Sequence, residues 1–492
     1  MSRDPLERYE PVIGLEVHTH LATRSKLFSP APVRYGEEPN HAVHFVDLGL
    51  PGVLPVLNER VVDLAIRLGL SIHATVQRRS VFARKNYFYP DLPKGYQISQ
   101  FELPIVSDGW IDIELPAEAG AKAAPIRKRI GITRAHLEED AGKSIHDVAV
   151  AGGDDTHIDL NRCGVALLEI VSEPDLRSAA EAGAYLRKLR SILRYTGVSE
   201  ADMEKGQFRC DANVSLRPVG QQEFGTRTEL KNINSFRFVE EAIEAEIERQ
   251  AHVLDEGGQI QQCTLHYEPS TRITRVLRTK ENADDYRYFP DPDLIPLVIA
   301  EERIERVRAA LPELPEERRA RIGSEYELSD YDARLLTESR EIADFFEACA
   351  KRCKKPKSAA NWVLRDVLQV LKERDTSLDA LALTPETLAS LIGLVEEGRL
   401  TAKSGRELLP ELALEGGDPE AMMRERGLEA VSDTGMLEAS VDEVIAANPE
   451  AVEQIRGGDA KAINFLMGQV MKKTQGKANA GQVRKLLSDK LP

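Results

Sequence analysis

The stretch VIGLEVHTHL, residues Val12–Leu21, has the alternating polarity of a β-strand that is buried on one side. Successive side chains of a strand point to opposite faces, so one face here is aliphatic and the other carries a carboxylate and two imidazoles. The aliphatic residues are Ile13, Leu15, Val17 and Leu21, and the polar residues are Glu16, His18 and His20. The aliphatic face requires a hydrophobic core. The polar face is either solvated surface or a place that holds something positively charged.

Short alternating segments of the same kind continue to about residue 295. They are separated by Gly and Pro turns, as in YQISQFEL (96–103) and FRCDANVSLRP (208–218). Two helices interrupt them, and each begins at a serine that is suited to cap it, Ser178 or Ser235. Strands that surround a few helices, mostly antiparallel by pattern, predict an α+β domain over residues 1–295.

From residue 296 the sequence becomes rich in Ala, Leu, Glu and Arg with helical spacing. The segment LTPETLASLIGLVEEG (383–398) has Thr384 as an N-cap, Pro385 at the first helical position and a glycine at its end. We expect an all-α helical domain over residues 296–400 and a helical tail domain over residues 401–492.

The composition limits the class of protein. A chain of 492 residues is too long for one hydrophobic core and should form two to four domains. No stretch approaches the roughly 20 apolar residues that span a bilayer, and the N-terminus lacks the apolar segment of a secretory signal. The five cysteines are scattered and form no paired zinc motif, which favours a reducing compartment. We expect a cytoplasmic protein that makes no membrane contact.

Charge is distributed unevenly along the chain. The formal net charge of −16 argues against general nucleic-acid binding, which needs Lys and Arg. Residues 461–492, however, carry seven Lys or Arg against one Asp, a local excess of six positive charges. This cluster is either a solvated surface or a contact with a phosphate backbone, and composition alone does not decide between the two.

Carboxylates inside apolar or alternating segments are the candidates for chemistry. Glu169 stands in the apolar run VALLEIV (165–171), and Glu138 and Glu139 are adjacent in RAHLEED (134–140). Burying an unpaired charge is costly, so Glu169 should be paired, protonated or bound to a metal. Carboxylates with a histidine and without thiolates favour Mg²⁺ or Mn²⁺ over zinc. A solvent-facing antiparallel sheet would produce the same alternation in any one segment.

Several familiar signatures of nucleotide and amidase chemistry are missing from the sequence. It has no G-x-x-x-x-G-K-[ST] loop, no G-x-G-x-x-G after a strand and no set of kinase motifs. It also lacks a nucleophile elbow and a Gly/Ser-rich amidase run. A nucleotide would have to be held by a metal and by strand side chains rather than by a Gly-rich loop.

A series of longer motifs runs in a fixed order along nearly the whole chain. They are VIGLEVHTHL, DLGLPGVLPVLN, RKNYFYPDLPKGYQISQFE, IGITRAHLEEDAGKS, LEIVSEPD, RCDANVSLRP, ELKNINSF, DDYRYFPDPDL and NFLMGQVMKKTQGKAN. With these motifs the sequence resembles the B-subunit family of the aspartyl/glutamyl-tRNA(Asn/Gln) amidotransferases.

The resemblance implies an activity and a set of partners. An N-terminal cradle domain would carry an ATP-dependent kinase activity, and the tail domain would contact tRNA. The side-chain carboxylate of mischarged Glu-tRNA(Gln) or Asp-tRNA(Asn) would attack the γ-phosphate of ATP with the help of Mg²⁺. Ammonia from the amidase (glutaminase) chain, known as the A subunit and braced by a small C subunit, would then displace phosphate to give Gln-tRNA or Asn-tRNA. The chain would be the ligase component of a heterotrimer.

The resemblance also assigns roles to individual residues. Metal ligands are expected among Glu16, His18, Glu138, Glu139, Glu169 and Glu229, with His18, Glu139 and Glu169 as the preferred set and the other three at a second ion. The expected catalytic residues are Glu16, His18, Glu139, Glu169 and Glu229. Nucleotide or phosphate contacts are expected from Lys85, Arg209, Asn213 and Ser215, and tRNA contacts from Lys472, Lys473 and Lys477. His20 is not expected to be a ligand, and the cysteine-free segment 26–52 predicts no zinc there.

Two alternatives stay open at this point. The chain could be a tRNA-binding scaffold whose chemistry lies in its partners, although a scaffold has no need for carboxylates and histidines on strand faces. It could also be a metal-dependent nuclease, which would use the same ligand chemistry without ATP. The sequence does not say whether Glu-tRNA, Asp-tRNA or both are substrates.

Overall fold

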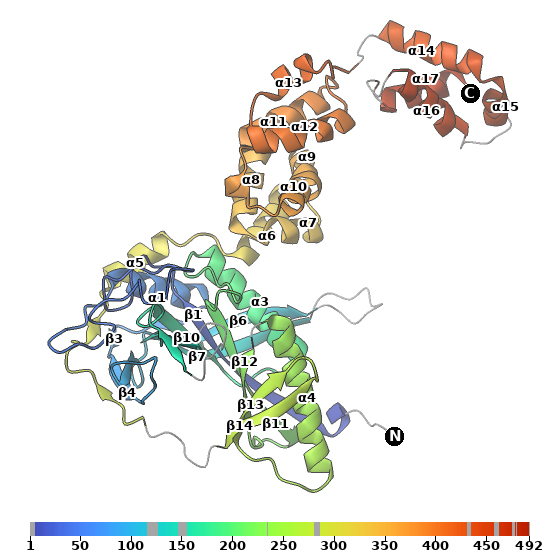
Figure 1. Ribbon diagram of the computed structural model, residues 1–492. Coiled ribbons are helices and arrows are strands. Elements are labelled where there is room, and N and C mark those ends of the chain that lie inside the picture. Colours follow the sequence, from blue (N-terminus) through green and yellow to red (C-terminus); the bar gives the residue numbers. More distant parts are fainter. Residues whose placement is uncertain are drawn as a thin grey trace. The chain divides into compact units, whose positions relative to one another are not determined.

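The computed structural model of the chain describes residues 5–115, 126–145, 155–233, 235–279, 286–430, 434–456, 462–474, 478 and 480–491. Tertiary contacts divide the chain into two compact units, Met1–Leu314 and Pro315–Pro492 (Figure 1). The predicted architecture, a mostly antiparallel sheet with helices followed by helices alone, is confirmed. Contacts assign no third unit, so the predicted boundaries at 295/296 and 400/401 stay predictions.

A nine-stranded sheet forms the centre of the N-terminal unit. In sheet order its strands are β14 (Ile273–Thr279), β13 (Cys263–Glu268), β12 (Thr228–Ile233), β11 (Phe208–Pro218), β1 (Tyr9–His20), β10 (Ala166–Ser172), β7 (Ile126–Glu139), β6 (Val106–Leu115) and β2 (Thr75–Val76). Neighbouring strands are antiparallel except β12 and β13, which are parallel. The alternating stretch Val12–Leu21 therefore lies almost entirely in the middle strand, β1.

Three long helices pack against this sheet and bury its aliphatic side chains. They are α1 (Glu59–Ser71), α3 (Ala179–Tyr195) and α4 (Phe236–Asp255). Ile13 and Val17 of β1 are fully buried and share one core with Leu186 of α3 and Ile243 of α4. Complete burial of such a side chain stabilises the fold by about 1.5–3 kcal/mol. The aliphatic face of β1 thus has the core that its sequence requires.

Serine caps fix where two of these helices begin. The hydroxyl of Ser178 accepts a hydrogen bond from the backbone N–H of Glu181 at 3.2 Å, and α3 starts at the next residue. Ser235 accepts from the N–H of Phe238 at 3.1 Å in the same way, ahead of α4. Each cap satisfies a backbone donor that the first helical turn leaves unpaired.

Smaller elements complete the N-terminal unit. They are η1 (Pro5–Glu7), β3 (Arg79–Ser80), β4 (Ala83–Asn86), β5 (Tyr96–Ser99), β8 (Lys143–Ile145), β9 (His157–Asp159), β15 (Phe289–Pro290), β16 (Leu297–Val298) and α5 (Glu301–Ala309). The strands β15, β4 and β5 form a small sheet of their own. Its strand β5 meets the end of β7, where the backbone N–H of Ile98 donates to the carboxylate of Glu139 at 3.1 Å. This small sheet therefore adds side chains from residues 83–99 to the polar side of the large one.

The described part of the second unit is built from helices. They are α6 (Pro315–Glu325), α7 (Asp330–Leu336), α8 (Arg340–Ala350), α9 (Pro356–Asn361), η2 (Trp362–Val367), α10 (Leu368–Arg374), η3 (Leu378–Ala380), α11 (Pro385–Glu396), α12 (Ala402–Glu415), α13 (Pro419–Glu425), α14 (Thr434–Ala447), α15 (Pro449–Arg456), α16 (Ala462–Lys473) and α17 (Ala480–Lys490). One hydrophobic core includes Phe346 and Leu391, and a second includes Val441 and Leu487. Among the described residues, no helix combines the length and the apolar character that crossing a membrane requires.

Candidate functional site

The register of three adjacent strands brings two histidines and a carboxylate into one row. His18 of β1 pairs with Glu169 of β10, and Glu169 pairs with His136 of β7. On the other side of β1, strand β11 places Arg209 opposite His18. Directly opposed residues of antiparallel strands project to the same face. The polar face of β1 therefore continues across its neighbours and becomes a site rather than an isolated stripe.

Four side chains form what we call the acid–imidazole cluster: His18, His136, Glu138 and Glu169. The Nε2 atom of His18 lies 3.2 Å from Oε2 of Glu169 and 3.9 Å from Oε1 of Glu138. The Nε2 atom of His136 lies 3.4 Å from Oε2 of Glu169 and 3.7 Å from Oε2 of Glu138. None of the four side chains is more than 19% exposed. Water therefore screens these charges only weakly.

Within the cluster, burial and opposite charges compete to set the pKa values. Burial alone lowers the pKa of His136, but the charge of Glu169 and hydrogen bonds with both glutamates raise it to about 9. Burial also lowers the pKa of His18, and the hydrogen bond and charge of Glu169 more than reverse this, so that it is raised. Burial raises the pKa of Glu169, but His136 and His18 hold it well below its usual value. Glu169 is thus a carboxylate at neutral pH, and the cluster favours positive charge.

Three members of the cluster fit a divalent cation. One nitrogen of His18 and one oxygen each of Glu138 and Glu169 lie within 4.8 Å of one another. Carboxylate oxygens with one imidazole and no thiolate suit Mg²⁺ or Mn²⁺. Among the residues that the structure describes, the buried Nδ1 atom of His136 has no hydrogen-bond partner, and Nε2 of the same ring faces the two glutamates. The chemistry of the donor set thus agrees with the ion expected from the sequence.

A second charged group surrounds Asp140, directly after β7. Its carboxylate oxygen Oδ2 lies 2.7 Å from Nε2 of His20, 2.9 Å from Nη2 of Arg209 and 3.3 Å from Nε of Arg162. Burial raises the pKa of Asp140, but the charges of Arg209 and Arg162 and the hydrogen bond of His20 bring it far below its usual value. One carboxylate cannot neutralise two guanidinium groups, so this group keeps an excess of positive charge beside the acid–imidazole cluster.

A third charged group lies on β11 and β12. The ammonium of Lys231 is 2.9 Å from Asp211 and 3.2 Å from Glu229, and Thr264 donates a hydrogen bond to Glu229 at 2.8 Å. Burial lowers the pKa of Lys231, but the charges of Asp211 and Glu229 raise it above its usual value. Lys231 is therefore held as a cation.

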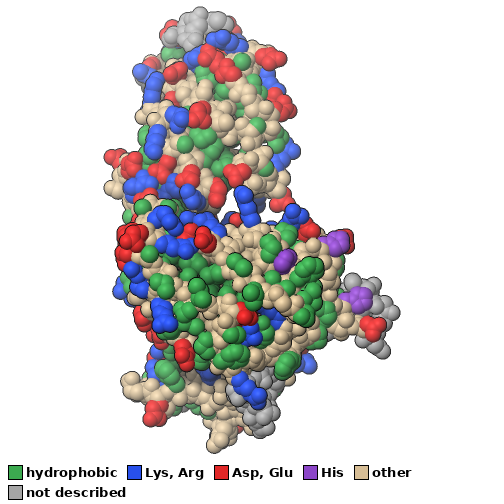
Figure 2. Space-filling view, turned by 90° about the vertical axis from the view of Figure 1, so that its left-hand side faces the viewer, with side chains coloured by type: hydrophobic (Ala, Val, Ile, Leu, Met, Phe, Trp, Pro, Cys, Tyr) green, Lys and Arg blue, Asp and Glu red, His purple; other side chains and the backbone are tan. Residues whose placement is uncertain are grey.

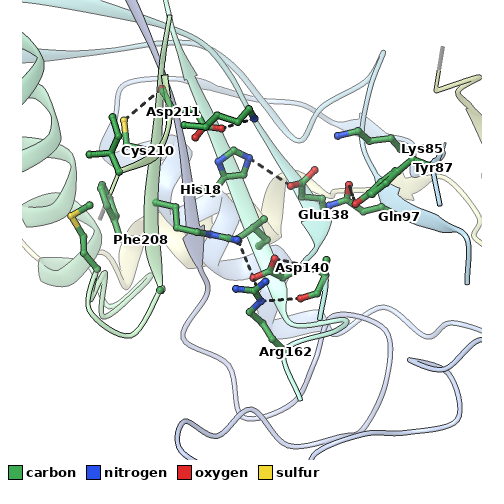
Figure 3. Close-up of a pocket in the computed structure, with 17 residues that line it drawn as sticks. His18, Lys85, Tyr87, Gln97, Glu138, Asp140, Arg162, Phe208, Cys210 and Asp211 are labelled. Atoms are coloured by element: carbon green, nitrogen blue, oxygen red, sulfur yellow. Dashed lines mark hydrogen bonds and ion pairs between the residues drawn. The ribbon is translucent and has the colours of Figure 1, made fainter. Parts of the chain in front are cut away.

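These groups line a cavity of about 560 Å³, a size typical of small-molecule sites (Figure 3). In Figure 3, Lys85, Tyr87 and Gln97 come from one side, and Phe208, Cys210 and Asp211 from the other. The charged residues that line it are His18, Lys85, Glu138, Asp140, Arg162, Arg209, Asp211 and Lys231. Acidic groups for a cation and basic groups for an anion thus share one hollow. A nucleoside triphosphate with its metal has this combination of charges.

The residues predicted from the sequence are only partly brought together. His18, Glu138, Lys85 and Arg209 line the cavity, and Glu169 touches His18. Glu16 accepts a hydrogen bond from the amide of Asn213 at 2.9 Å, and Glu229 pairs with Lys231.

Two predicted residues are engaged elsewhere. The carboxylate of Glu139 pairs with the ammonium of Lys94 and accepts from the N–H of Ile98 at 3.1 Å, so the structure gathers Glu138, and not Glu139, with His18 and Glu169. The hydroxyl of Ser215 is buried and donates to the backbone carbonyl of Val12 at 3.4 Å, which makes it part of the β1–β11 packing.

The sequence analysis assigned no role to four residues of the site: His136 of the acid–imidazole cluster, and Asp140, Arg162 and Lys231, which line the cavity. The alternation of RAHLEED holds a signal for the first two, because His136, Glu138 and Asp140 are spaced by two and share a face. Arg162 lies outside the strands and has no comparable local signal.

The three lysines expected to contact tRNA differ in their surroundings. Lys472 is exposed near the end of α16, and Lys473 is exposed but forms an ion pair with Glu443 of α14. Lys477 lies outside the described residues.

Comparison with known proteins identifies relatives over nearly the whole chain. A sequence profile described as the GatB/GatE catalytic domain matches residues 11–305, and one described as the GatB domain matches residues 344–491. The chain is also similar to three curated proteins, each named as the B subunit of an aspartyl/glutamyl-tRNA(Asn/Gln) amidotransferase. The proteins of Alkalilimnicola ehrlichii and Geotalea uraniireducens are each 53% identical, and that of Nitratidesulfovibrio vulgaris is 54% identical. Each alignment covers 98% of this chain and 99% of the relative.

Proposed function

The chain belongs to the GatB/GatE family of amidotransferase B subunits, and from this membership we propose that it activates the side-chain carboxylate of a mischarged aminoacyl-tRNA with ATP. The substrates are Glu-tRNA(Gln), Asp-tRNA(Asn) or both. The carboxylate attacks the γ-phosphate and ADP leaves, and ammonia from a partner glutaminase chain then displaces phosphate to form the amide. The observation that carries this proposal is the pairing of a hard-ligand cluster with basic side chains around one cavity.

The charges of the cavity suit the first step of this reaction. A carboxylate and a triphosphate repel each other, so a catalyst must neutralise the phosphate oxygens as they approach. When bound by His18, Glu138 and Glu169, Mg²⁺ would supply charge neutralisation at those oxygens. Arg209 and Arg162, fixed by Asp140, would hold phosphate oxygens by charge-assisted hydrogen bonds, and Lys85 adds a cation from β4.

Two further charged residues, Lys231 and His136, would keep the site in a fixed arrangement for the substrate. Lys231 is held between Asp211 and Glu229, so its ammonium is positioned before any ligand arrives. His136 donates from Nε2 toward Glu169 and Glu138, which fixes the orientation of both carboxylates. Preorganised groups of this kind lower the barrier because they do not have to reorient during the reaction.

An exposed aromatic surface beside the cavity supports docking of the partner chains. Phe88 is 88% exposed and Phe101 is 52% exposed, and Phe101 stacks on Tyr288 with ring centroids 4.2 Å apart. Tyr87 lines the cavity and contacts the rings of Tyr89 and Tyr286. Figure 2 shows hydrophobic side chains gathered on one face of the N-terminal unit. Exposed apolar clusters are typical of protein–protein contacts, and we assign this one to the amidase partner (the A subunit), with the small C subunit bracing the pair.

The central test is ATP cleavage by the assembled complex with Glu-tRNA(Gln) or Asp-tRNA(Asn). We expect release of ADP to be stimulated at least about tenfold by the mischarged tRNA, to stop when EDTA removes divalent cations, and to return with excess Mg²⁺. Uncharged tRNA is the matched control, because it lacks the carboxylate that accepts the phosphoryl group.

Two other results would each overturn the proposal. Binding of tRNA without any ATP cleavage would leave the chain as a scaffold. Cleavage of tRNA in Mg²⁺ without ATP, seen on a denaturing gel, would make it a nuclease.

The basic tail gives a separate prediction for tRNA binding. Because Lys473 is paired with Glu443 and Lys472 is not in any such ion pair among the described residues, Lys472→Ala should weaken tRNA binding more than Lys473→Ala. The Lys472 variant should also reduce the slope of log affinity against log salt by about one. Fluorescence anisotropy with labelled tRNA at several salt concentrations measures both. Equal affinities and slopes for wild type and both variants would mean that the cluster is only a solvated surface.

A further inference from the structure

We propose that Cys349 and Cys353 of the helical unit form a redox-active dithiol that a hydroperoxide converts into an intrachain disulfide. The pair lies in a unit that contains none of the cavity residues described above, so the inference does not rest on the proposed ligase function. The other three cysteines, Cys163, Cys210 and Cys263, lie in the N-terminal unit and are buried.

The position of the two sulfur atoms is the first reason. Their Sγ atoms are 4.0 Å apart, within reach of a weak thiol hydrogen bond. A disulfide bond is about 2.05 Å long, so the sulfurs must approach by roughly 2 Å.

The local backbone allows this approach. Cys349 lies in the last turn of α8 and is fully buried, whereas Cys353 lies beyond the helix, in the turn before α9, and is partly exposed. The backbone N–H of Cys353 bonds to the carbonyl of Ala350 at 3.2 Å, and no intact helical turn has to break when its side chain moves. The sulfur of Cys349 is therefore held in place by the helix, whereas the sulfur of Cys353 lies on a short turn that solvent can reach.

The protonation of the pair suits an attack by Cys353. The two thiols share a weak hydrogen bond in which either sulfur can be the donor, and this contact lowers the pKa of Cys353 and raises that of Cys349. In contrast, burial raises the pKa of Cys163, to about 12, and also raises those of Cys210 and Cys263. Cys353 is also the one cysteine of the five that is partly exposed, so a hydroperoxide can reach it, and we assign it as the nucleophile.

The surroundings favour oxidation over metal binding. Two thiolates on one zinc ion also lie about 4 Å apart, but a structural zinc site needs four ligands. Among the described residues, no carboxylate, imidazole or further thiol joins the two sulfurs in a group of ligand atoms within 4.8 Å of one another. Because no third metal ligand lies beside the two thiols in the described part of the chain, their expected chemistry is formation of a disulfide.

The reaction balances with one hydroperoxide as the oxidant. The Cys353 thiolate attacks one peroxide oxygen of H₂O₂, the O–O bond breaks, and hydroxide leaves a sulfenic acid on Cys353. The sulfur of Cys349 then gives up its proton and attacks the Cys353 sulfur, which releases a second hydroxide and forms the S–S bond. In total, two thiols and H₂O₂ give one disulfide and two molecules of water. The product ties the turn carrying Lys351, Arg352 and Lys354 to α8.

Peptide mapping of the full-length protein tests the proposal directly. The native chain is treated with H₂O₂, free thiols are blocked with iodoacetamide, and the chain is digested with trypsin. Trypsin cuts after Lys351 and Arg352, so Cys349 and Cys353 end in different peptides unless a disulfide joins them. We expect the joined peptides, two hydrogen atoms lighter than their sum, and their separation after dithiothreitol.

Matched variants make the outcome decisive. Cys353→Ser should abolish the joined peptides, whereas Cys263→Ser should leave them unchanged. Without oxidant, the iodoacetamide rate of Cys353 in the wild type should exceed those of Cys163, Cys210 and Cys263 by at least about tenfold. This second measurement needs no variant to fold. Separate, fully alkylated Cys349 and Cys353 peptides after peroxide treatment, or oxidation of Cys353 that stops at the sulfonic acid, would overturn the proposal.

Discussion

Replacement of His18 by alanine is expected to lower tRNA-dependent ATP cleavage by about two to four orders of magnitude, because under the proposed function it removes a metal ligand and with it several kcal/mol of charge stabilisation. His18 is the imidazole that faces both Glu138 and Glu169, at 3.9 and 3.2 Å. The same variant should bind Mn²⁺ at least about tenfold more weakly, measured by titration calorimetry or by electron paramagnetic resonance. Glutamine hydrolysis by the amidase component of the assembled complex should continue, since the proposed function assigns that chemistry to another chain.

A matched histidine replacement separates this effect from a general loss of structure. His252 lies on α4 with its side chain 73% exposed, so His252→Ala should keep both activities and Mn²⁺ affinity. Glu229→Ala removes a group that contacts Lys231 and Thr264 rather than the acid–imidazole cluster, and we expect it to lower amidation while leaving Mn²⁺ affinity at the cluster unchanged. Normal amidation by the His18 variant would show that the cluster is not the metal site of the reaction.

Replacement of Asp47 by alanine is expected to lower the free energy of unfolding of the N-terminal unit by about 3–5 kcal/mol, the usual cost of leaving one charge of a buried pair without its partner. The Asp47 carboxylate lies 3.0 Å from the ammonium of Lys26, and their side chains are 2% and 0% exposed. Asp47 also accepts a hydrogen bond from the backbone N–H of His44 at 2.9 Å. The Asp47→Ala change therefore removes the carboxylate partner of both the Lys26 ammonium and the His44 N–H.

Denaturant unfolding followed by tryptophan fluorescence measures this effect. The chain has two tryptophans, Trp110 in the N-terminal unit and Trp362 in the helical unit, so a Trp362→Phe background reports on the N-terminal unit. The double variant Lys26→Met/Asp47→Leu should recover most of the lost stability, because it leaves no unpaired charge. If Asp47→Ala alone costs less than about 1 kcal/mol, water reaches the Lys26 ammonium and the pair is not buried in solution.

On the strand faces that carry His18 and Glu169, the local sequence pattern correctly predicts which kind of surroundings each side chain has. The alternation of Val12–Leu21 predicts that His18 lies on a polar face opposite a core, and the structure confirms that core at Ile13 and Val17. A carboxylate inside the apolar run around Glu169 predicts that this group is paired, protonated or bound to a metal, and the structure pairs it with His18 and His136. In each case the cost of burying a charge or exposing an aliphatic side chain is local enough to read from neighbouring residues.

The adjacent pair Glu138 and Glu139 marks the limit of such patterns. The alternation of RAHLEED places Glu138 on the same face as His136, but it does not show that this face meets His18. The structure gathers Glu138 with His18, while Glu139 pairs with Lys94. The choice depends on the register of β7 against β10, and a shift of one residue would exchange their faces. That register is set by burial of the whole sheet.

By itself, the sequence determined the family, the α+β architecture, the strand character of its polar segments and the hard-ligand chemistry of their side chains. These follow from the order of motifs and from short-range periodicity. Only the tertiary structure decided that His136 joins the cluster, that Asp140 gathers His20, Arg162 and Arg209, and that Cys349 and Cys353 are separated by 4.0 Å. Periodicity fixes the direction in which a side chain points. The neighbour that it meets is fixed by packing between segments far apart in the chain.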